Sequence, residues 1–581
     1  MESSHRSYTY TALPSSTHIR TLVLQPSVDQ NSPLHCRVQE ISLDRSHAEP
    51  YEAISYTWGA PVFSHVLYSS DGTIFHITAN LHAALQRFRS PYHVRRLWAD
   101  AVCINQRDPL EKAVQINLMH RVFRCANKVL VWLGEGEMEM EAVNILWRVS
   151  QEARVANSED GEGSTPLVTR EDAVTIGRLL QMPWFSRRWI IQEVVLNSDV
   201  VIFCASVEIS WTRLFHAINI LSYHGLLRHV DRSVVGSLQV IHKLWQRWSL
   251  GIYGSTQLDL LSLLNTFDRF ECVDDRDRLY ALSALAERPR RQEAYDVRRL
   301  GRLVDVVDYS ASVEEVYIAF AARALCSDPY KLLSLATTHG QDDANRTLPS
   351  WVPDWRQRSR ASVPPLFHNR LQPIQIETLE ISQGVLHLGL PLMSIQYIYV
   401  STVTTAYDLT SFDPHATMQW ILKSAHHFAR FGYPSPRRPR DGDSLSVICD
   451  LISNRFPNIN LSWLRWNAGD KDSLATKNRP ALKLVHHVMA ERCLLIAHGG
   501  YDMCAGIGSA NVKKGDVGIK FETSDFGERP YGCILRPVPA PAASRFPSYT
   551  LVGEACFGFG TPVPERNFER TNIDQKILRI V

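Results

Sequence analysis

The chain has 581 residues, 45% hydrophobic and 21% charged, and its 62 basic and 60 acidic residues leave a net charge of +2. This composition is typical of globular protein, and the balance of charge gives no reason to expect a nucleic-acid or anionic-membrane partner. The 11 cysteines occur singly, without a C-x-x-C pair, which indicates reduced thiols. The first residues lack the apolar core of a signal peptide, and no apolar run approaches the roughly twenty residues that span a bilayer. We therefore expect a cytoplasmic protein without a membrane span.

The chain begins with short strand-like runs. Residues 1–44 are expected to form an N-terminal arm, in which 19–24 and 36–41 have the composition of edge strands or of a hairpin. Residues 51–56 form the first convincing strand, and the turn at 57–59 ends it.

Residues 97–135 are the stretch around which the other elements are organised. A first strand, 97–102, is apolar except for Asp100. Asp108 is a good N-cap for the helix that follows, and Glu111 stands where a capping-box carboxylate belongs. One helix face is expected to be buried and carries Leu110, Val114, Leu118 and Val122. A second apolar strand completes a strand–helix–strand sequence, which predicts a right-handed parallel unit.

The elements fall into four regions. After the arm, alternating strands and helices over residues 45–205 predict an α/β domain with a mostly parallel sheet. Residues 206–347 have helical periods and few strand signals. Residues 348–581 are predicted to form a β-rich C-terminal module with a helical insertion.

Four stretches together resemble the fungal heterokaryon-incompatibility (HET) domain family in order, spacing and residue types. They are YEAISYTWG at 51–59, RLWADAVCINQRDPLEKAVQINLM at 96–119, ANKVLVWLG at 126–134 and SRRWIIQEVVL at 186–196. Weaker resemblance to the regions that usually follow this domain continues at 269–285, 307–317, 348–355, 515–537 and 548–560.

The resemblance implies a role in nonself recognition and regulated cell death in a filamentous fungus. The HET domain is thought to be a relative of the Toll/interleukin-receptor (TIR) fold, some members of which cleave NAD after self-association. Their essential glutamate follows a tryptophan in a pattern like S-x-W-x-x-x-E. Ser186, Trp189 and Glu193 resemble that pattern, with one extra residue before the tryptophan. The resemblance therefore implies that Glu193 is catalytic and that NAD is a possible substrate, with no resident cofactor.

The residue types suit that chemistry. Cleavage of the nicotinamide–ribose bond builds positive charge on the ribose, which a carboxylate such as Glu193 would stabilise. Trp189 stands four residues earlier, on the same helix face, and could stack on a ring of the dinucleotide. Because nicotinamide leaves as a neutral base, a second acidic residue is not obligatory.

Further binding residues are expected where strands end. In an open α/β sheet, ligands lie beyond the carboxyl ends of the strands. The candidates for contact with NAD are Ser55, Tyr56, Trp58, Gly59, Asp100, Asn105 and Gln106. None of the 22 histidines has metal-ligand spacing, so no metal site is expected.

Each candidate has a structural alternative. Glu193 could pair with Arg187 or Arg188, and Trp189 could belong to the core. Asp100 could bond backbone at a strand end, whereas Asn105 and Gln106 could form a turn ahead of the helix; Glu111 is predicted to be a cap. Two hypotheses follow. The chain triggers cell death by self-association after meeting a nonself partner, with or without NAD cleavage, or it is a non-enzymatic binding protein that keeps the HET scaffold.

Overall fold

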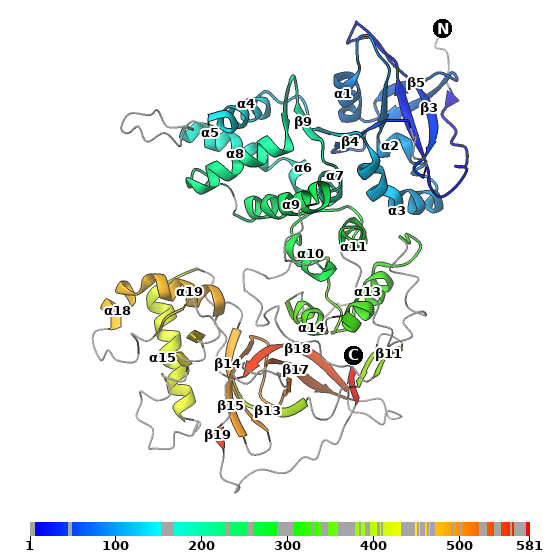
Figure 1. Ribbon diagram of the computed structural model, residues 1–581. Coiled ribbons are helices and arrows are strands. Elements are labelled where there is room, and N and C mark those ends of the chain that lie inside the picture. The colour runs from blue at the N-terminus through cyan, green and yellow to red at the C-terminus, as the bar shows by residue number, and fades with distance from the viewer. Residues whose placement is uncertain are drawn as a thin grey trace. The chain divides into compact units, whose positions relative to one another are not determined.

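The computed structural model describes residues 6–44, 49–152, 168–227, 230, 232–251, 259–286, 307–327, 329–338 and 347–357, and parts of 378–581 with gaps. The chain divides into two compact units, Met1–Arg290 with Asp305–Ser312, and Arg291–Val304 with Val313–Val581 (Figure 1). Each unit contains one large sheet. The expected fold class, an α/β N-terminal part followed by helices and a β-rich C-terminal module, is confirmed.

The N-terminal sheet has ten strands in the order β1-β6-β5-β3-β2-β7-β4-β8-β9-β10. Its centre is parallel and consists of β7 (Arg95–Trp98), β4 (Glu52–Tyr56), β8 (Lys128–Trp132) and β9 (Val200–Cys204). Along the chain β4 comes first, β7 second and β8 third, so the order reverses between β4 and β8. In a doubly wound sheet such a reversal marks the crevice where ligands bind, outside the carboxyl ends of the strands.

Residues 19–24 and 36–41, predicted as edge strands or a hairpin, form an antiparallel pair, β2 (His18–Leu24) with β3 (Leu34–Ser42). Strand β2 also pairs with β7, so it lies inside the sheet. This part of the expected N-terminal arm therefore belongs to the sheet. A second hairpin joins β5 (His65–Ser69) to β6 (Thr73–Ile77) around Gly72, whose φ of +82° suits a tight turn. The short β1 (Arg6–Ser7) pairs with β6, and β10 (Val207–Ser210) pairs with β9.

Helix α3 (Pro109–Cys125) begins where predicted, because the Asp108 carboxylate accepts hydrogen bonds from the backbone N–H groups of its first turn. The predicted buried face was half wrong. Leu110 is 81% exposed and Val114 is 38% exposed, whereas the buried residues are Gln115, Leu118, Met119, Val122 and Phe123. The pattern fails because polar side chains face the sheet in this part of α3: Glu111 bonds to Arg20 of β2, and Gln115 donates to the His18 carbonyl.

This correction gives a matched pair of substitutions. Leu118→Glu places a charge at a position only 8% exposed, so it is expected to unfold the N-terminal unit, because an unpaired buried charge costs several kcal/mol. Leu110→Glu, eight residues earlier on the exposed side, is expected to leave the unit folded. Hydrogen exchange of the central strands measures both. A Leu118→Glu chain that retains full protection contradicts the placement of α3.

Helices flank the parallel strands. They are α1 (Ala79–Phe88), α2 (Asp100–Cys103), α4 (Glu137–Glu152), α5 (Arg170–Leu180), α6 (Pro183–Ser186) and α7 (Ile190–Val195). The expected helical region contributes α8 (Trp211–Tyr223), α9 (Arg232–Leu250), α10 (Leu260–Thr266) and α11 (Asp277–Ser283) to the same unit. Helices α4, α5 and α8 pack beside one another, whereas α7 contacts α3, α9 and α11 (Figure 1).

The second unit contains α13 (Val313–Ser327), α14 (Pro329–Thr338) and a ten-stranded sheet in the order β11-β12-β20-β18-β17-β16-β13-β14-β15-β19. The strands are β11 (Thr378–Ser382), β12 (Val385–Gly389), β13 (Ile395–Val403), β14 (Arg492–Gly499), β15 (Asp502–Ser509), β16 (Val517–Phe521), β17 (Tyr531–Val538), β18 (Ser548–Phe557), β19 (Thr561–Pro562) and β20 (Ile577–Ile580). The expected helical insertion lies between β13 and β14 and contains α15 (Pro414–Arg430), α18 (Lys471–Lys477) and α19 (Arg479–Met489).

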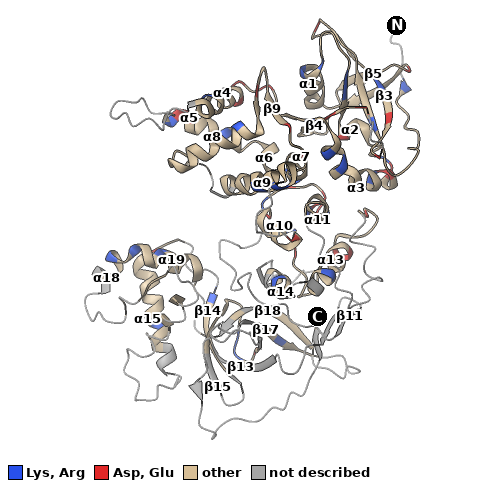
Figure 2. Cartoon of the chain, viewed as in Figure 1, with Lys and Arg blue, Asp and Glu red and all other residues tan. Residues whose placement is uncertain are grey.

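Charged side chains are dispersed over the described elements, where short blue and red segments are scattered along a mostly tan ribbon (Figure 2). This agrees with the balanced composition. Within the described part of the chain, no helix has both the length and the apolar character needed to cross a membrane.

Candidate functional site

Glu193 lies in α7, close to the carboxyl end of β4. The single helix face expected for Trp189 and Glu193 is not found, because two short helices, α6 and α7, are separated by residues 187–189, of which Arg187 is extended. Trp189 is the N-cap residue of α7 and accepts a hydrogen bond from the backbone N–H of Glu193. The break turns α7 so that the Glu193 carboxylate reaches the sheet, where the residue is only 3% exposed.

Ser55, near the end of β4, joins Glu193 to a tryptophan that the sequence did not reveal as a site residue. The indole N–H of Trp184 donates to Ser55 Oγ at 2.8 Å. Because an indole nitrogen can only donate, the Ser55 hydroxyl accepts this bond and gives its own proton to Glu193 Oε2. All three residues are buried. Trp184 therefore fixes the direction of the serine hydroxyl toward the carboxylate.

Arg187 is the charged partner of Glu193. Its Nη2 lies 3.6 Å from Glu193 Oε1, and its Nη1 donates to the backbone carbonyl of Tyr56. The alternative that Glu193 pairs with Arg187 is thus realised in the structure. Burial raises the pKa of Glu193, while the charge of Arg187 and the hydroxyl of Ser55 oppose that shift. The carboxyl group therefore titrates above its ordinary range, as a group suited to acid–base chemistry would.

Asp100 lies near the same strand end, although its predicted position in a strand was wrong. Strand β7 ends at Trp98, and Asp100 is the first residue of α2. Both of its carboxylate oxygens accept from Trp58 Nε1, at 3.2 and 3.0 Å, and the Asp100 charge is felt by Glu193 and Tyr56. Burial, with that charge, keeps the pKa of Tyr56 well above its ordinary value. Asp100 therefore anchors Trp58, and both carboxylates lie near the end of β4.

The remaining predicted binding residues have local partners. The side-chain Oδ1 of Asn105 accepts from the backbone N–H of Arg107 at 3.3 Å, and Gln106 Nε2 donates to the Asp100 carbonyl at 3.0 Å. These are the contacts of turn-forming residues. Gly59 has a φ of +71°, which a glycine adopts readily after the strand.

Asn80 in α1 is a second residue at this strand end that no sequence pattern indicated. Its side chain donates to the Thr57 carbonyl at 2.5 Å and accepts from Trp132 Nε1 at 3.0 Å. It therefore bridges the ends of β4 and β8, where the strand order reverses.

Trp189 does not share a site with Glu193, contrary to the expectation from their spacing. Its Nε1 donates to Asp277 Oδ2 in α11 at 3.1 Å. The i, i+4 spacing fails as a guide because Trp189 precedes the first turn of α7 and its ring extends toward the following helices. The stacking role proposed for Trp189 therefore has no geometric support, and Trp184 is the aromatic side chain bonded into the Glu193 cluster.

The other side of α7 is bound to residues 267–281 by buried hydrogen bonds. Arg188, 1% exposed, donates to the carbonyls of Phe267, Phe270 and Arg278 at 2.6, 3.5 and 2.9 Å. Gln192 Nε2 donates to the carbonyls of Ala281 and Tyr280 at 2.8 and 3.3 Å. Helix α7 is therefore held between the sheet and the α10–α11 pair.

Asp277 makes this side of α7 sensitive to pH. Burial raises its pKa to about 6, from an ordinary 3.8, although Tyr309, Trp189 and Lys112 favour the charged form and Asp274 opposes it. Because the pKa of Asp277 is higher in the folded chain than in the unfolded chain, the stability it contributes is fully present below about pH 4. That contribution is lost as pH rises through about 6.

We expect wild type to lose about 3 kcal/mol of stability relative to Asp277→Asn between about pH 4 and pH 7. Hydrogen exchange of α7 and α11 amides over that range measures the difference. Parallel stability curves for the two chains would refute it.

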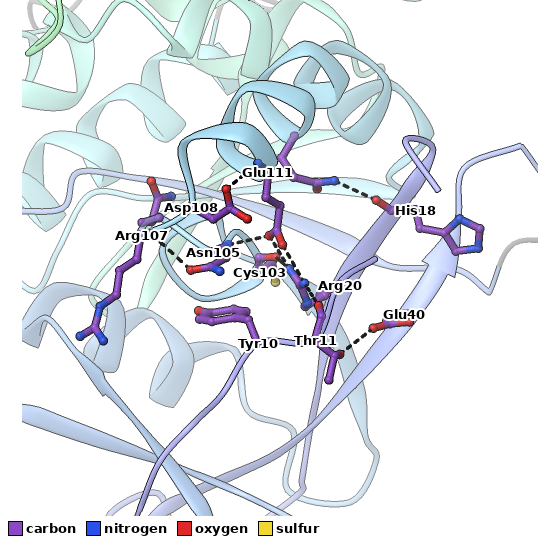
Figure 3. Close-up of polar contacts among 12 residues, drawn as sticks. Tyr10, Thr11, His18, Arg20, Glu40, Cys103, Asn105, Arg107, Asp108 and Glu111 are labelled. Carbon is purple, nitrogen blue, oxygen red and sulfur yellow. Dashed lines mark hydrogen bonds and ion pairs between the residues drawn. The ribbon is translucent and has the colours of Figure 1, made fainter. Parts of the chain in front are cut away.

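Glu111, predicted to be a helix cap, is instead part of a buried ion pair (Figure 3). Its two oxygens accept from Arg20 Nη1 and Nη2 at 2.6 and 3.0 Å, and Oε1 also accepts from the Asn105 backbone N–H at 2.8 Å. Arg20 is fully buried in β2 and further donates to the carbonyls of Cys103 and Thr11. The pair thus ties β2 to the turn that contains Asn105.

Comparisons with known proteins give one family match and one significant relative among curated proteins. Residues 51–193 match the model of the heterokaryon incompatibility protein (HET) family, a segment that runs from the residue before β4 to Glu193. The chain is 26% identical over 410 residues to heterokaryon incompatibility protein 6, OR allele, of Neurospora crassa, a match that covers 59% of this chain and 58% of that relative. No solved structure gives a significant match. Residues 51–193 of this chain are therefore similar to the HET domain.

Proposed function

We propose that this chain acts in heterokaryon incompatibility, and that its N-terminal unit is a TIR-like domain that self-associates and triggers cell death through NAD cleavage at Glu193. The HET match and the name of the Neurospora relative support the first part. The reversal of strand order between β4 and β8 supports a nucleotide site at this edge.

The observation that carries the enzymatic proposal is the buried Glu193 at the end of β4. Ser55 and Trp184 fix the carboxylate, so its orientation does not depend on substrate. In a site with little water, a fixed carboxylate stabilises positive charge developing on a ribose more strongly than it would in bulk water. Glu193 would supply that charge, and nicotinamide would leave without needing a proton.

A second candidate function is a non-enzymatic binding protein with the same scaffold. It is favoured by the ion pair between Glu193 and Arg187 and by the 3% exposure of Glu193. In this reading Glu193 is a structural residue that holds α7 against β4, and the domain signals through contact with a nonself partner.

The experiment is the NAD content of cells after inducible expression of wild type, Glu193→Gln and Glu141→Gln. Glu141 lies on the exposed side of α4 and serves as the matched control. We expect wild type and Glu141→Gln to deplete NAD, and Glu193→Gln to be slower by about 100-fold or more, the usual loss when one stabilising group is removed.

The outcomes separate the two candidates. Full depletion by a folded Glu193→Gln chain refutes the catalytic assignment. Growth arrest without NAD loss in all three chains supports the non-enzymatic function. Turnover by purified wild type, absent from purified Glu193→Gln, identifies the chain itself as the enzyme.

A further inference from the structure

Arg187 differs from the other deeply placed arginines of the N-terminal unit. Arg20 is fully buried and holds both oxygens of a carboxylate, and Arg188 is 1% exposed and donates to backbone carbonyls. The Arg187 side chain is 24% exposed, and its nearest contact with a carboxylate is 3.6 Å. The first two arginines are buried structural groups, whereas Arg187 is partly exposed to solvent at the edge of the candidate site.

The contacts of Arg187 leave donor capacity at this edge. Strong guanidinium–carboxylate hydrogen bonds have lengths of about 2.7–2.9 Å, so the 3.6 Å separation from Glu193 is a loose ion pair. A second bond goes to the Tyr56 carbonyl. Among the residues that the structure describes, no hydrogen bond from Arg187 Nε is found. A planar group with unused N–H donors suits a two-oxygen anion.

The backbone of Arg187 is fixed even though its side chain is loosely paired. The backbone N–H of Arg188 donates to the Glu271 carbonyl at 2.9 Å, and the Glu271 N–H donates to the Ser186 carbonyl at 2.7 Å. These bonds form a bridge between Arg187 and Glu271. The guanidinium can therefore change partners without movement of the chain that carries it.

A ligand from solvent can reach Arg187 more easily than Glu193. The Glu193 side chain is 4% exposed and that of Arg187 is 24% exposed, and both lie at the end of β4 beside the reversal of strand order. A ligand that reaches this edge from solvent meets the more exposed guanidinium. If an oxyanion binds there, it competes with Glu193 for the same positive charge.

We propose that Arg187 binds a phosphate of the substrate, and that Glu193 is the ion-pair partner of Arg187 when no substrate is bound. The proposal rests on the proposed function, because it names the pyrophosphate of a dinucleotide as the group recognised at the same site. Phosphate binding draws Arg187 from Glu193 and leaves the carboxylate, still bonded to Ser55, free to face the ribose. The substrate thus completes its own site.

The test is calorimetric titration of the full chain with inorganic pyrophosphate, which cannot undergo the cleavage reaction. The variants are wild type, Glu193→Gln, Arg187→Gln, the double variant and Arg178→Gln, an exposed arginine of α5 that serves as the control. Because removal of the competing carboxylate frees the guanidinium, Glu193→Gln is expected to bind pyrophosphate about tenfold more tightly than wild type. Arg187→Gln and the double variant are expected to lose binding, and Arg178→Gln to match wild type.

The gain in Glu193→Gln is the decisive result, since misfolding cannot raise affinity. Unchanged or weaker binding by Glu193→Gln overturns the proposal, as does unchanged binding by Arg187→Gln. Equal titration with citrate and pyrophosphate would show a general anion site and would overturn the choice of phosphate. The titration measures no turnover, so the two proposals can fail separately. Tighter binding by Glu193→Gln in a chain that never cleaves NAD upholds this inference and refutes the proposed reaction. NAD cleavage without Arg187-dependent binding upholds the reaction and refutes this inference.

Discussion

Glu111→Gln is expected to lower the unfolding free energy of the N-terminal unit by about 3–5 kcal/mol, because it leaves the fully buried Arg20 without its carboxylate. The same carboxylate accepts from the Asn105 backbone, so the turn before α3 is loosened as well. Hydrogen exchange of β2 and β7 amides in the full chain reports this loss without requiring the whole molecule to unfold in one step.

Two control variants test whether the loss comes from leaving a buried charge unpaired rather than from breaking an ion pair. Asp199→Asn breaks the exposed pair with Lys128 and is expected to cost less than about 1 kcal/mol. The double variant Arg20→Met/Glu111→Leu removes both charges and is expected to recover much of the loss, because apolar groups of similar size replace a buried pair well. A Glu111→Gln chain that exchanges like the Asp199→Asn chain would show that Arg20 is not stabilised by its partner.

A fragment of residues 1–205, which ends at the boundary suggested by composition, is expected not to fold cooperatively. It retains Arg188 and Gln192 but removes the carbonyls of residues 267–281 to which both side chains donate. Each unsatisfied buried group costs about 1–3 kcal/mol and an unpaired charge costs more, so the sum is of the order of a domain's total stability.

The matched fragment is 1–312, which contains the whole N-terminal unit. It is expected to give a sharp thermal transition and dispersed amide resonances, whereas 1–205 is expected to give neither. A sharp transition for 1–205 alone would mean that the HET domain folds without α10 and α11, and that the Arg188 contacts are dispensable.

Features that depend on neighbouring residues were predictable from the sequence. Asp108 caps α3 and Thr169 forms a capping box with Asp172, because these bonds span only a few residues. The apolar strands β4 and β8 were also predictable, since a strand covered on both faces is a continuous apolar run. The mostly parallel centre of the sheet follows from the alternation of such strands with helices.

The candidate site was only half predictable, because its contacts join residues distant in the chain. The pair Ser55–Glu193 is separated by 138 positions, and the pair Trp184–Ser55 by 129. Resemblance to a family motif identified Glu193, but no local pattern distinguishes Trp184 from any other core tryptophan. Spacing misplaced Trp189 for the same reason, since the break at 187–189 between α6 and α7 redirects a side chain that an unbroken helix would keep beside Glu193.

The double attachment of α7 limits how such proteins can be recombined. A chimera that takes residues 51–205 from this chain and 206–312 from a related chain joins Arg188 of the first to the carbonyls around Phe267 and Arg278 in the second. If those turns differ in length between the parents, the guanidinium loses its acceptors, and the chimera fails to fold. Exchange of segments between chains built this way therefore requires crossovers outside residues 186–281, so that both sides of α7 are inherited from one parent.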